Sequence, residues 1–289
     1  MKNLKITVLC VAIVIVSSVQ AQLLWQISGN GISPSYLFGT HHLIEKNQIN
    51  NFDQMLEKLQ NTDAVIGEMD MSNMLGMQLK MMQAAVMKDT TMQDLLNKDD
   101  YQLVDKELKA VVGSGLSKFG KMKPMMLSSM YTVMLYMQHH HLKKQPEAVD
   151  LLFQKSAKKM KKEIVGLETV EQQIDILFNS ISLERQAELL VEGMKDKEKS
   201  LDELDKLNSA YIAGDLALLE TIYLENDDMS ADENKILLEQ RNNNWMDQLS
   251  KILLVKSCFI AVGCMHLVGE TGLIIQLKRA GYVVEAVSF

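Results

Sequence analysis

The sequence has little cysteine and little proline, and after its first 21 residues no apolar run approaches the length of a membrane-spanning helix. Three cysteines in 289 residues exclude a small fold held together by disulfides, and three prolines are typical of a helix-rich chain. P-loop, Gly-x-Gly-x-x-Gly, Gly-x-Ser-x-Gly and Cys-x-x-Cys motifs are also absent. These absences argue against nucleotide-binding, serine hydrolase and thioredoxin-like functions.

The composition indicates a globular protein with a large core. Hydrophobic residues make up 47% of the chain and charged residues 23%, which is more apolar than a disordered chain. The formal net charge is −7 at pH 7. A net negative charge argues against nucleic acids and anionic membranes as partners.

The first 21 residues have the pattern of a secretory signal peptide. Lys2 and Lys5 precede an apolar stretch, Ile6 to Val16, that is too short to span a bilayer, and Val19-Gln20-Ala21 fits a small-x-small cleavage site. Removal of both lysines, with no acidic residue, would change the net charge from −7 to −9. We therefore expect an exported protein, periplasmic or extracellular, with no membrane span in the mature chain.

The two cysteines after the signal peptide predict free thiols. Cys258 and Cys264 lie on one apolar run, and an extended strand would separate them by about 20 Å. This separation is too large for a disulfide between them in one chain.

Local patterns predict strands near both ends of the chain and helices between them. Alternation broken by Gly and Asn from Leu23 to Thr40 is typical of a β-hairpin. Short apolar runs predict further strands, and 3.6-residue spacing predicts helices, a long methionine-rich segment among them. The strands expected are 64–67, 163–167, 258–262 and 282–287, and the helices 51–60, 151–160, 170–190, 201–225, 232–250 and 270–280. We predict an α/β fold, a mixed central sheet with flanking helices and a helical insertion at about 70–150, in one domain over residues 22–289.

Two predicted strands end in the same motif, Gly-x-x-His. Gly39 to His42 follows one apolar run and Gly263 to His266 follows another. With 15 glycines and 6 histidines, about 0.3 such motifs would be expected by chance. Ligands of open α/β sheets bind beyond the carboxyl ends of the strands, so His42 and His266 are candidates for a metal pair or an acid–base pair. The alternative is a pair of turn histidines facing solvent.

Carboxylates occupy matching positions after two other predicted strands. Glu68 follows the strand 64–67, and Glu168 follows the strand 163–167. Each carboxylate alone is equally well explained as a polar residue that ends a strand. Two histidines and two glutamates at four strand ends, however, make a suitable set of ligands for a divalent cation or an activated water.

Several motifs together resemble the TraB/GumN family, which includes the Tiki-type Wnt-cleaving proteases and is similar in fold to erythromycin esterase and ChaN-like proteins. The resemblance runs from about Leu24 to the C-terminus and excludes most of the methionine-rich stretch. The motifs that carry it are Leu37 to His42, Val65 to Asp70, Gly166 to Gln173, Arg241 to Trp245, Val262 to Leu273, and Gly281-Tyr282.

The resemblance implies a metal-dependent hydrolase of peptides, or of a similar small amide or ester. It places the paired motif histidines on His42 and His266 and the acidic site residues on Glu68 and Glu168. His42, His266 and one glutamate, Glu68, would hold a divalent Mn, Co or Zn ion, and the other glutamate would act as general base. Arg241 would bind a substrate carboxylate, orient the developing charge or steady a site glutamate. His41 is an alternative to His42 as the metal-binding histidine of the first motif.

Other signals have simpler explanations. The methionines from residue 69 to 137 recur at spacings of three and four, which indicates packing in a core or an apolar groove rather than copper ligation. His139, His140 and His141 are consecutive, so a helix would point them in different directions and we expect a solvated helix end. The alternative to an enzyme is a non-catalytic exported protein whose histidine pair holds a metal or haem iron.

Overall fold

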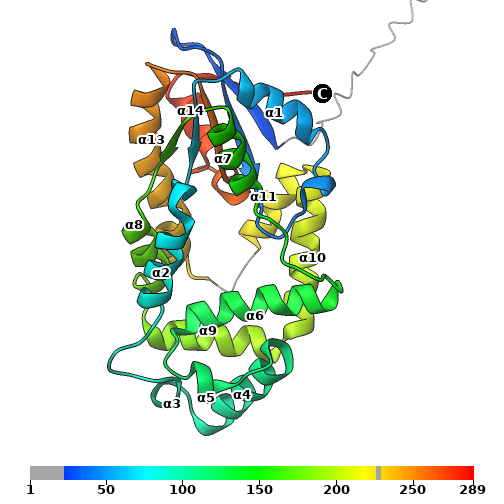
Figure 1. Ribbon diagram of the computed structural model, residues 1–289, viewed down its shortest axis with the longest axis vertical. Coiled ribbons are helices and arrows are strands. Elements are labelled where there is room, and N and C mark those ends of the chain that lie inside the picture. Colours follow the sequence, from blue (N-terminus) through cyan, green and yellow to red (C-terminus); the bar gives the residue numbers. More distant parts are fainter. Residues whose placement is uncertain (1–22, 226–228) are drawn as a thin grey trace, which may run out of the picture.

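The computed structural model describes residues 23–225 and 229–289, and the predicted signal peptide lies outside these residues. Six strands form one mixed sheet in the order β4-β3-β5-β2-β1-β6. Helices cover both faces of the sheet and form a separate helical region beside it (Figure 1). The α/β class with a mixed sheet is therefore as predicted. The strands are β1 (Leu24–Ser28), β2 (Ser35–Thr40), β3 (Ala64–Gly67), β4 (Glu163–Gly166), β5 (Cys258–Gly263) and β6 (Val283–Ala286).

Four of the strands run parallel and two pairings are antiparallel. β2 and β3 each pair parallel with β5, and β4 pairs parallel with β3. β1 is antiparallel to both β2 and β6. The hairpin predicted from Leu23 to Thr40 is β1–β2, and its turn places Gly29, Asn30 and Gly31 at positive φ, a backbone region that Gly and Asn tolerate best.

Alternating side chains of the strands enter two different cores. Phe38 and Phe259 pack on one face of the sheet with Phe153 of α7 (Val149–Lys159). Leu37 and Ile260 point to the other face, where they meet α13 (Gln240–Leu253) and α14 (Leu273–Arg279). The period of two along each strand thus accounts for a sheet that is buried on both sides. α1 (Phe52–Gln60) and α11 (Leu216–Leu224) join α7 on the first face.

A third core holds the helical region together, away from the sheet (Figure 1). It contains Met92, Leu108, Leu127 and Leu190, each fully or almost fully buried. The helices between β3 and β4 are α2 (Met74–Ala84), α3 (Met92–Leu95), α4 (Lys98–Val112), α5 (Leu116–Phe119), α6 (Pro124–His139) and α7. The later helix α9 (Leu183–Lys195) packs against α4 and α6, so this region draws on more of the chain than the predicted insertion.

Two long predicted helices are each two helices. The predicted helix 170–190 is α8 (Val170–Phe178) followed by α9, because Asn179 ends the first and the side chain of Ser182 caps the second. The predicted helix 201–225 is α10 (Lys197–Ala213) followed by α11, and Gly214 at φ +69° ends α10. Residues 231–253 are continuous, with α12 (Ala231–Asn234), one π-helical segment and α13.

The methionine-rich stretch is only partly buried. Met87 and Met92 belong to the core of the helical region, as predicted. α2 has no buried residue, and Met82 is 62% exposed. Core packing is therefore confirmed for Met87 and Met92, whereas the methionines of α2 do not lie in a core.

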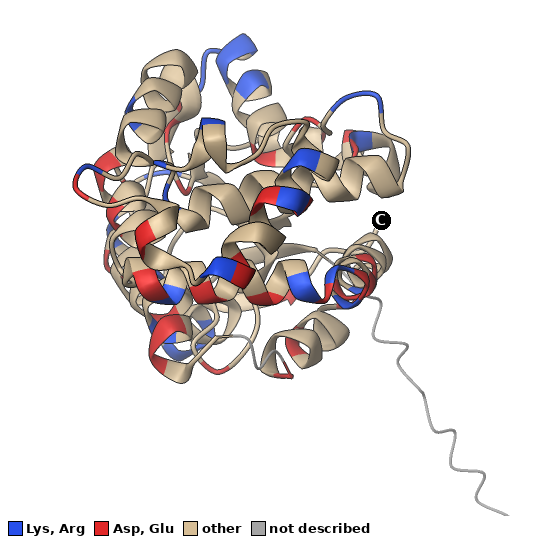
Figure 2. Cartoon of the chain, turned by 90° about the horizontal axis from the view of Figure 1, so that it is seen from below, with Lys and Arg blue, Asp and Glu red and all other residues tan. Residues whose placement is uncertain are grey.

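The two cysteines of the described chain are free thiols, and its surface carries charges of both signs. Cys258 and Cys264 are both free and buried, as predicted. Acidic and basic residues are interleaved along the helices when the molecule is viewed from the helical region (Figure 2). Within residues 23–225 and 229–289, no helix combines the length and the apolar character needed to cross a membrane.

Candidate functional site at the carboxyl edge of the sheet

The four strands that precede the candidate residues end side by side. Thr40 of β2 lies opposite Gly263 of β5 in the parallel ladder. Gly67 of β3 lies opposite Ala261 of β5 on one side and Gly166 of β4 on the other. Because these strands are parallel, the residues that follow them leave the sheet at one edge. This register brings the loops of His42, His266, Glu68 and Glu168 together, as the repeated motifs predict.

A cavity of about 590 Å³ opens at this edge. His42, Glu68, Arg241 and His266 line it, and residues of α6 such as Thr132 line its opposite wall. Glu168 is not among the residues that line it. The sheet therefore supplies the polar floor of the cavity, and the helical region supplies a wall.

Arg241 is the centre of the polar cluster. Its Nε and Nη2 donate to the two oxygens of Glu168 over 2.7 and 2.9 Å. Nη2 also donates to Glu68 Oε2 over 2.6 Å, and Nη1 lies 3.0 Å from His266 Nε2. One guanidinium thus contacts three of the four other predicted residues, all but His42. These contacts use the fork geometry of the arginine side chain.

Glu168 fixes the position of Arg241 through two hydrogen bonds. Its side chain is 6% exposed, and Oε1 also accepts a hydrogen bond from Trp245 Nε1 over 2.9 Å. Trp245 lies one helical turn after Arg241 on α13, and its ring lies 4.8 Å from the guanidinium carbon. Of the two roles left open for Glu168, strand end or site residue, the contacts support a third: it fixes the arginine that reaches the cavity.

Glu68 is an ionised carboxylate with most of its acceptor positions in use. Oε1 accepts from the backbone N–H of Gly263 over 2.8 Å, and Oε2 accepts from Gln173 Nε2 as well as from Arg241. Burial raises the pKa of Glu68, but His266 when it is protonated, the positive charge of Arg241 and the hydrogen bond from Gly263 lower it to about 2. The carboxyl is charged throughout the physiological range.

His266 is neutral, and its tautomer follows from its neighbours. Asn242 uses its Nδ2 to donate to the carbonyls of His266 and Thr271, so its Oδ1 accepts from His266 Nδ1 over 2.7 Å. The proton is therefore on Nδ1, and Nε2 offers its lone pair to Arg241. Burial lowers the pKa of His266 to about 4, against the attraction of Glu68.

His42 and His41 differ in their surroundings. His42 is exposed at the cavity, and within the described part of the chain no hydrogen bond of its side chain is found. His41 is partly buried against Tyr211, and its Nδ1 accepts from the backbone N–H of Leu43 over 3.1 Å. Burial, with a smaller contribution from His42, lowers the pKa of His41 to about 4. His42 is thus the histidine of this pair that is available to a ligand.

Sequence reasoning did not assign roles to three residues that complete the cluster. Trp245 and Asn242 occur in the Arg241 to Trp245 motif, but only Trp245, four residues after Arg241, has the spacing that places it on the same helix face. No sequence pattern pointed to Tyr211, because it contacts a segment that is distant in the sequence. Its hydroxyl donates to the carbonyl of Gly39 over 2.8 Å. Burial raises the pKa of Tyr211 well above its usual value.

The motifs that meet in this cluster are those of one family. The sequence model of the TraB/PrgY/gumN family matches residues 23–286, almost all of the described chain. The chain belongs to the TraB/PrgY/gumN family. Neither the search of curated proteins nor the search of solved structures found a match.

The donors expected to hold a metal in this TraB/PrgY/gumN protein are of suitable type. Two imidazoles and an ionised carboxylate are ligand types that suit a first-row divalent ion. In the structure, however, Arg241 engages both His266 Nε2 and Glu68 Oε2. The residues therefore fit a divalent ion on one condition, that Arg241 withdraws from these two atoms.

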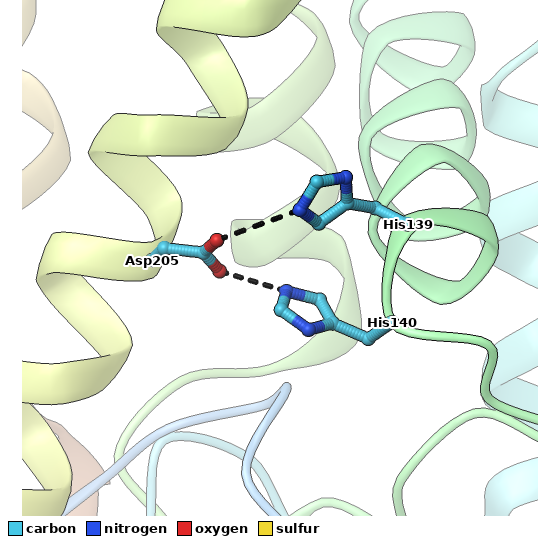
Figure 3. A group of neighbouring side chains, drawn as sticks. All are labelled: His139, His140 and Asp205. Carbon is cyan, nitrogen blue, oxygen red and sulfur yellow. Dashed lines mark hydrogen bonds and ion pairs between the residues drawn. The ribbon is translucent and has the colours of Figure 1, made fainter.

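A different group of side chains brings potential metal ligands close together. Among the described residues, the ligand atoms of His139, His140 and Asp205 all lie within 4.8 Å of one another (Figure 3). His42, His266 and Glu68 are not found as such a group within the same part of the chain. The expectation that consecutive histidines would diverge is wrong for His139 and His140, because α6 ends at His139 and His140 lies beyond it.

The first Gly-x-x-His motif of this TraB/PrgY/gumN protein needs its glycine for close packing. A Cβ at Gly39 would lie 3.0 Å from Cys264 Cβ and 3.1 Å from Cys264 Cα, in the second motif. We expect Gly39→Ala to lower the free energy of unfolding by about 1–3 kcal/mol, because β2 and the loop after β5 would have to separate. Urea denaturation measures this.

Gly193→Ala is the matched control for that substitution. Gly193 lies within α9, and a Cβ there would meet nothing within 4 Å. Alanine has a higher helix propensity than glycine, so the free energy of unfolding of this variant should rise by up to about 1 kcal/mol. Equal stabilities of the two variants would contradict the close approach at Gly39.

Proposed function

We propose that the chain is an exported metal-dependent hydrolase that cleaves peptides, or similar small amides or esters, in the cavity at the sheet edge. The observation that carries the proposal is the convergence of His42, Glu68, Arg241 and His266 on one cavity from distant parts of the chain. Its volume of about 590 Å³ is in the range of sites for small ligands and peptide side chains. Membership of the TraB/PrgY/gumN family supports the same class of activity.

His42, His266 and Glu68 would hold the divalent ion, which supplies Lewis acidity toward a carbonyl and a bound water. The contacts around them favour the deprotonated forms of Glu68 and of His266 Nε2, and Arg241 would withdraw from these two atoms when the ion binds. Arg241 and Gly263 keep Glu68 ionised, and Asn242 keeps the proton of His266 on Nδ1 and its Nε2 free of one. Second-neighbour contacts of this kind orient metal ligands.

Arg241 and Glu168 would divide the remaining work. Arg241 reaches the cavity and would bind a substrate carboxylate or the negative charge that develops on a carbonyl oxygen. Both oxygens of Glu168 accept hydrogen bonds from Arg241 and Trp245, and this side chain does not line the cavity. We therefore assign Glu168 to the positioning of Arg241 rather than to proton transfer. Glu68 is the carboxylate that faces the cavity.

Hydrolysis of an unstructured fluorogenic peptide tests the proposal. The purified chain is treated with a chelator and then supplied with manganese, cobalt or zinc. We expect one of these ions to restore hydrolysis, and we expect His42→Ala to lower kcat/KM at least about 100-fold, because an open metal position needs its ligands. His141→Ala, at an exposed histidine outside the cavity, is the control and should retain activity.

Two results would count against the enzyme. Undiminished hydrolysis in both His42→Ala and His266→Ala would remove the activity from this cavity. Tight retention of an ion or of haem iron, lost in His42→Ala and accompanied by no turnover of peptides or esters, would instead establish the non-catalytic binding protein that the same histidine pair allows.

A further inference from the structure

A second cluster of metal-ligating side chains lies outside the cavity, between two helices of the helical region (Figure 3). His139 is the last residue of α6, and His140 follows it. Asp205 lies on α10, and each of its oxygens faces one imidazole. His140 Nε2 is 2.8 Å from Oδ1, and His139 Nε2 is 3.9 Å from Oδ2.

The end of α6 explains how neighbouring histidines reach the same carboxylate. Within a helix, consecutive side chains point about 100° apart. His140 is at φ −91° and ψ 10°, outside regular helix geometry, and His141 has a positive φ. The ring of Tyr136 packs 4.3 Å from that of His140, which holds the imidazole against α6. The turn thus directs His139 and His140 toward α10 together.

We propose that His139, His140 and Asp205 bind a first-row divalent ion such as zinc, with a fourth position open to water. Zinc bonds of about 2.0–2.1 Å in a tetrahedron place ligand atoms about 3.3 Å apart. The separations of 2.8 and 3.9 Å, which run to different oxygens of Asp205, lie on either side of that value, and all the ligand atoms lie within 4.8 Å of one another, so rotation of the side chains would bring them to it. Two imidazoles and one carboxylate favour zinc, nickel or copper over magnesium and calcium, which prefer oxygen.

The ion would join α6 to α10 beside the cavity. Residues of α6, Ser128 and Thr132 among them, line the cavity, and so does Leu207 of α10, two residues after Asp205. α6 and α10 are linked by the His–Asp contacts where α6 ends, near the loop that returns to the sheet (Figure 1). A metal bond at this point would therefore stiffen one wall of the cavity. The site does not depend on the proposed hydrolase activity.

Zinc titration by calorimetry tests the site on the full chain without a polyhistidine tag. His42→Ala is used as the background, so that the cavity at the sheet edge contributes as little as possible. We expect one zinc ion per chain in this background. Adding His140→Ala or Asp205→Asn should weaken that binding about 100-fold, and adding His141→Ala, the neighbouring histidine, should leave it unchanged.

Two results would overturn the proposal. Undiminished zinc binding in Asp205→Asn would mean that the run of three histidines chelates the ion by itself, as a flexible tag does. An equal loss in His141→Ala would mean the same. Circular dichroism without metal verifies that Asp205→Asn remains folded.

Hydrogen exchange distinguishes a bridge between helices from binding to α6 alone. Zinc should slow exchange of the amides at the end of α6 and around Asp205 in α10, and it should do so in the parent chain but not in Asp205→Asn. Protection confined to α6 would contradict the bridge.

Discussion

Replacing Arg241 with glutamine should lower the free energy of unfolding by about 3–5 kcal/mol at pH 7. The guanidinium is the cation that Glu68 and Glu168 share, and these side chains are 20% and 6% exposed. Without Arg241, two carboxylates would remain close together in a poorly solvated site, since Glu68 would keep only the amide donors and Glu168 only Trp245. Removing one partner of a buried ionic cluster costs far more than removing a surface pair.

The loss in Arg241→Gln should shrink as the pH falls from 7 to 5. Without the guanidinium, burial and the neighbouring carboxylate of Glu168 would raise the pKa of Glu68 above its value in the unfolded chain. A folded state with a raised carboxyl pKa binds more protons at that group than the unfolded state, so this carboxyl contribution gives the variant stability relative to the parent chain as the pH falls within this window. In the parent chain, Glu68 changes the stability in the opposite direction. Its folded pKa of about 2 lies below that of the unfolded chain, so acidification lowers the free energy of unfolding there. Urea denaturation at pH 7, 6 and 5 would show the two curves converging.

Arg279→Gln is the matched control for the loss of an arginine–glutamate pair. Arg279 pairs with Glu270 at the surface, where both side chains are largely exposed. Its replacement should cost less than about 1 kcal/mol at every pH. A similarly small, pH-independent loss in Arg241→Gln would show that the cluster at the sheet edge is solvated, and the assignment of Arg241 as its central cation would be wrong.

The position of the cavity followed from local signals in the sequence. Each strand was marked by a short apolar run, and its end by glycine and a polar residue, as in Gly39 to His42 and Gly263 to His266. Parallel strands put such ends at one edge, so four independent local patterns located one site. The resemblance allowed Arg241 to steady a site glutamate, as its contacts with Glu68 and Glu168 do, but it did not show which glutamate would meet Arg241. Its motif showed that Trp245 shares its helix face, but the contact with Glu168 depends on how α13 packs on the sheet.

The helical region was less predictable for a related reason. Helical spacing identifies apolar faces but not the core that each face enters. α9 follows β4 in sequence, yet it packs with α4 and α6, so the boundary of the insertion was set by tertiary contacts. The pairing of His139 and His140 with Asp205 has the same origin, since it depends on the end of α6 and on the neighbouring α10.

The parent chain should lose stability as the pH falls from about 6.5 to 4. His266 and His41 each have a folded pKa of about 4, against 6.5 in the unfolded chain. Within this window the two histidines bind protons in the unfolded state but not in the folded state. Each histidine therefore lowers the free energy of unfolding by about 3 kcal/mol, a loss that is complete below pH 4. Above pH 6.5 neither residue contributes.

Two variants separate the contributions of these histidines to acid sensitivity. His266→Gln should remove its share of the slope between pH 6.5 and 4 and leave that of His41, and His41→Gln should do the reverse. The physical reason is that glutamine has no proton to gain in the unfolded chain, while burial, the main cause of both lowered pKa values, is unchanged. The measurement is the free energy of unfolding in urea across this range, referred to pH 7 for each variant. Profiles parallel to that of the parent chain would mean that both imidazoles accept a proton while folded, and that the tautomer assigned to His266 between Asn242 and Arg241 does not persist in acid.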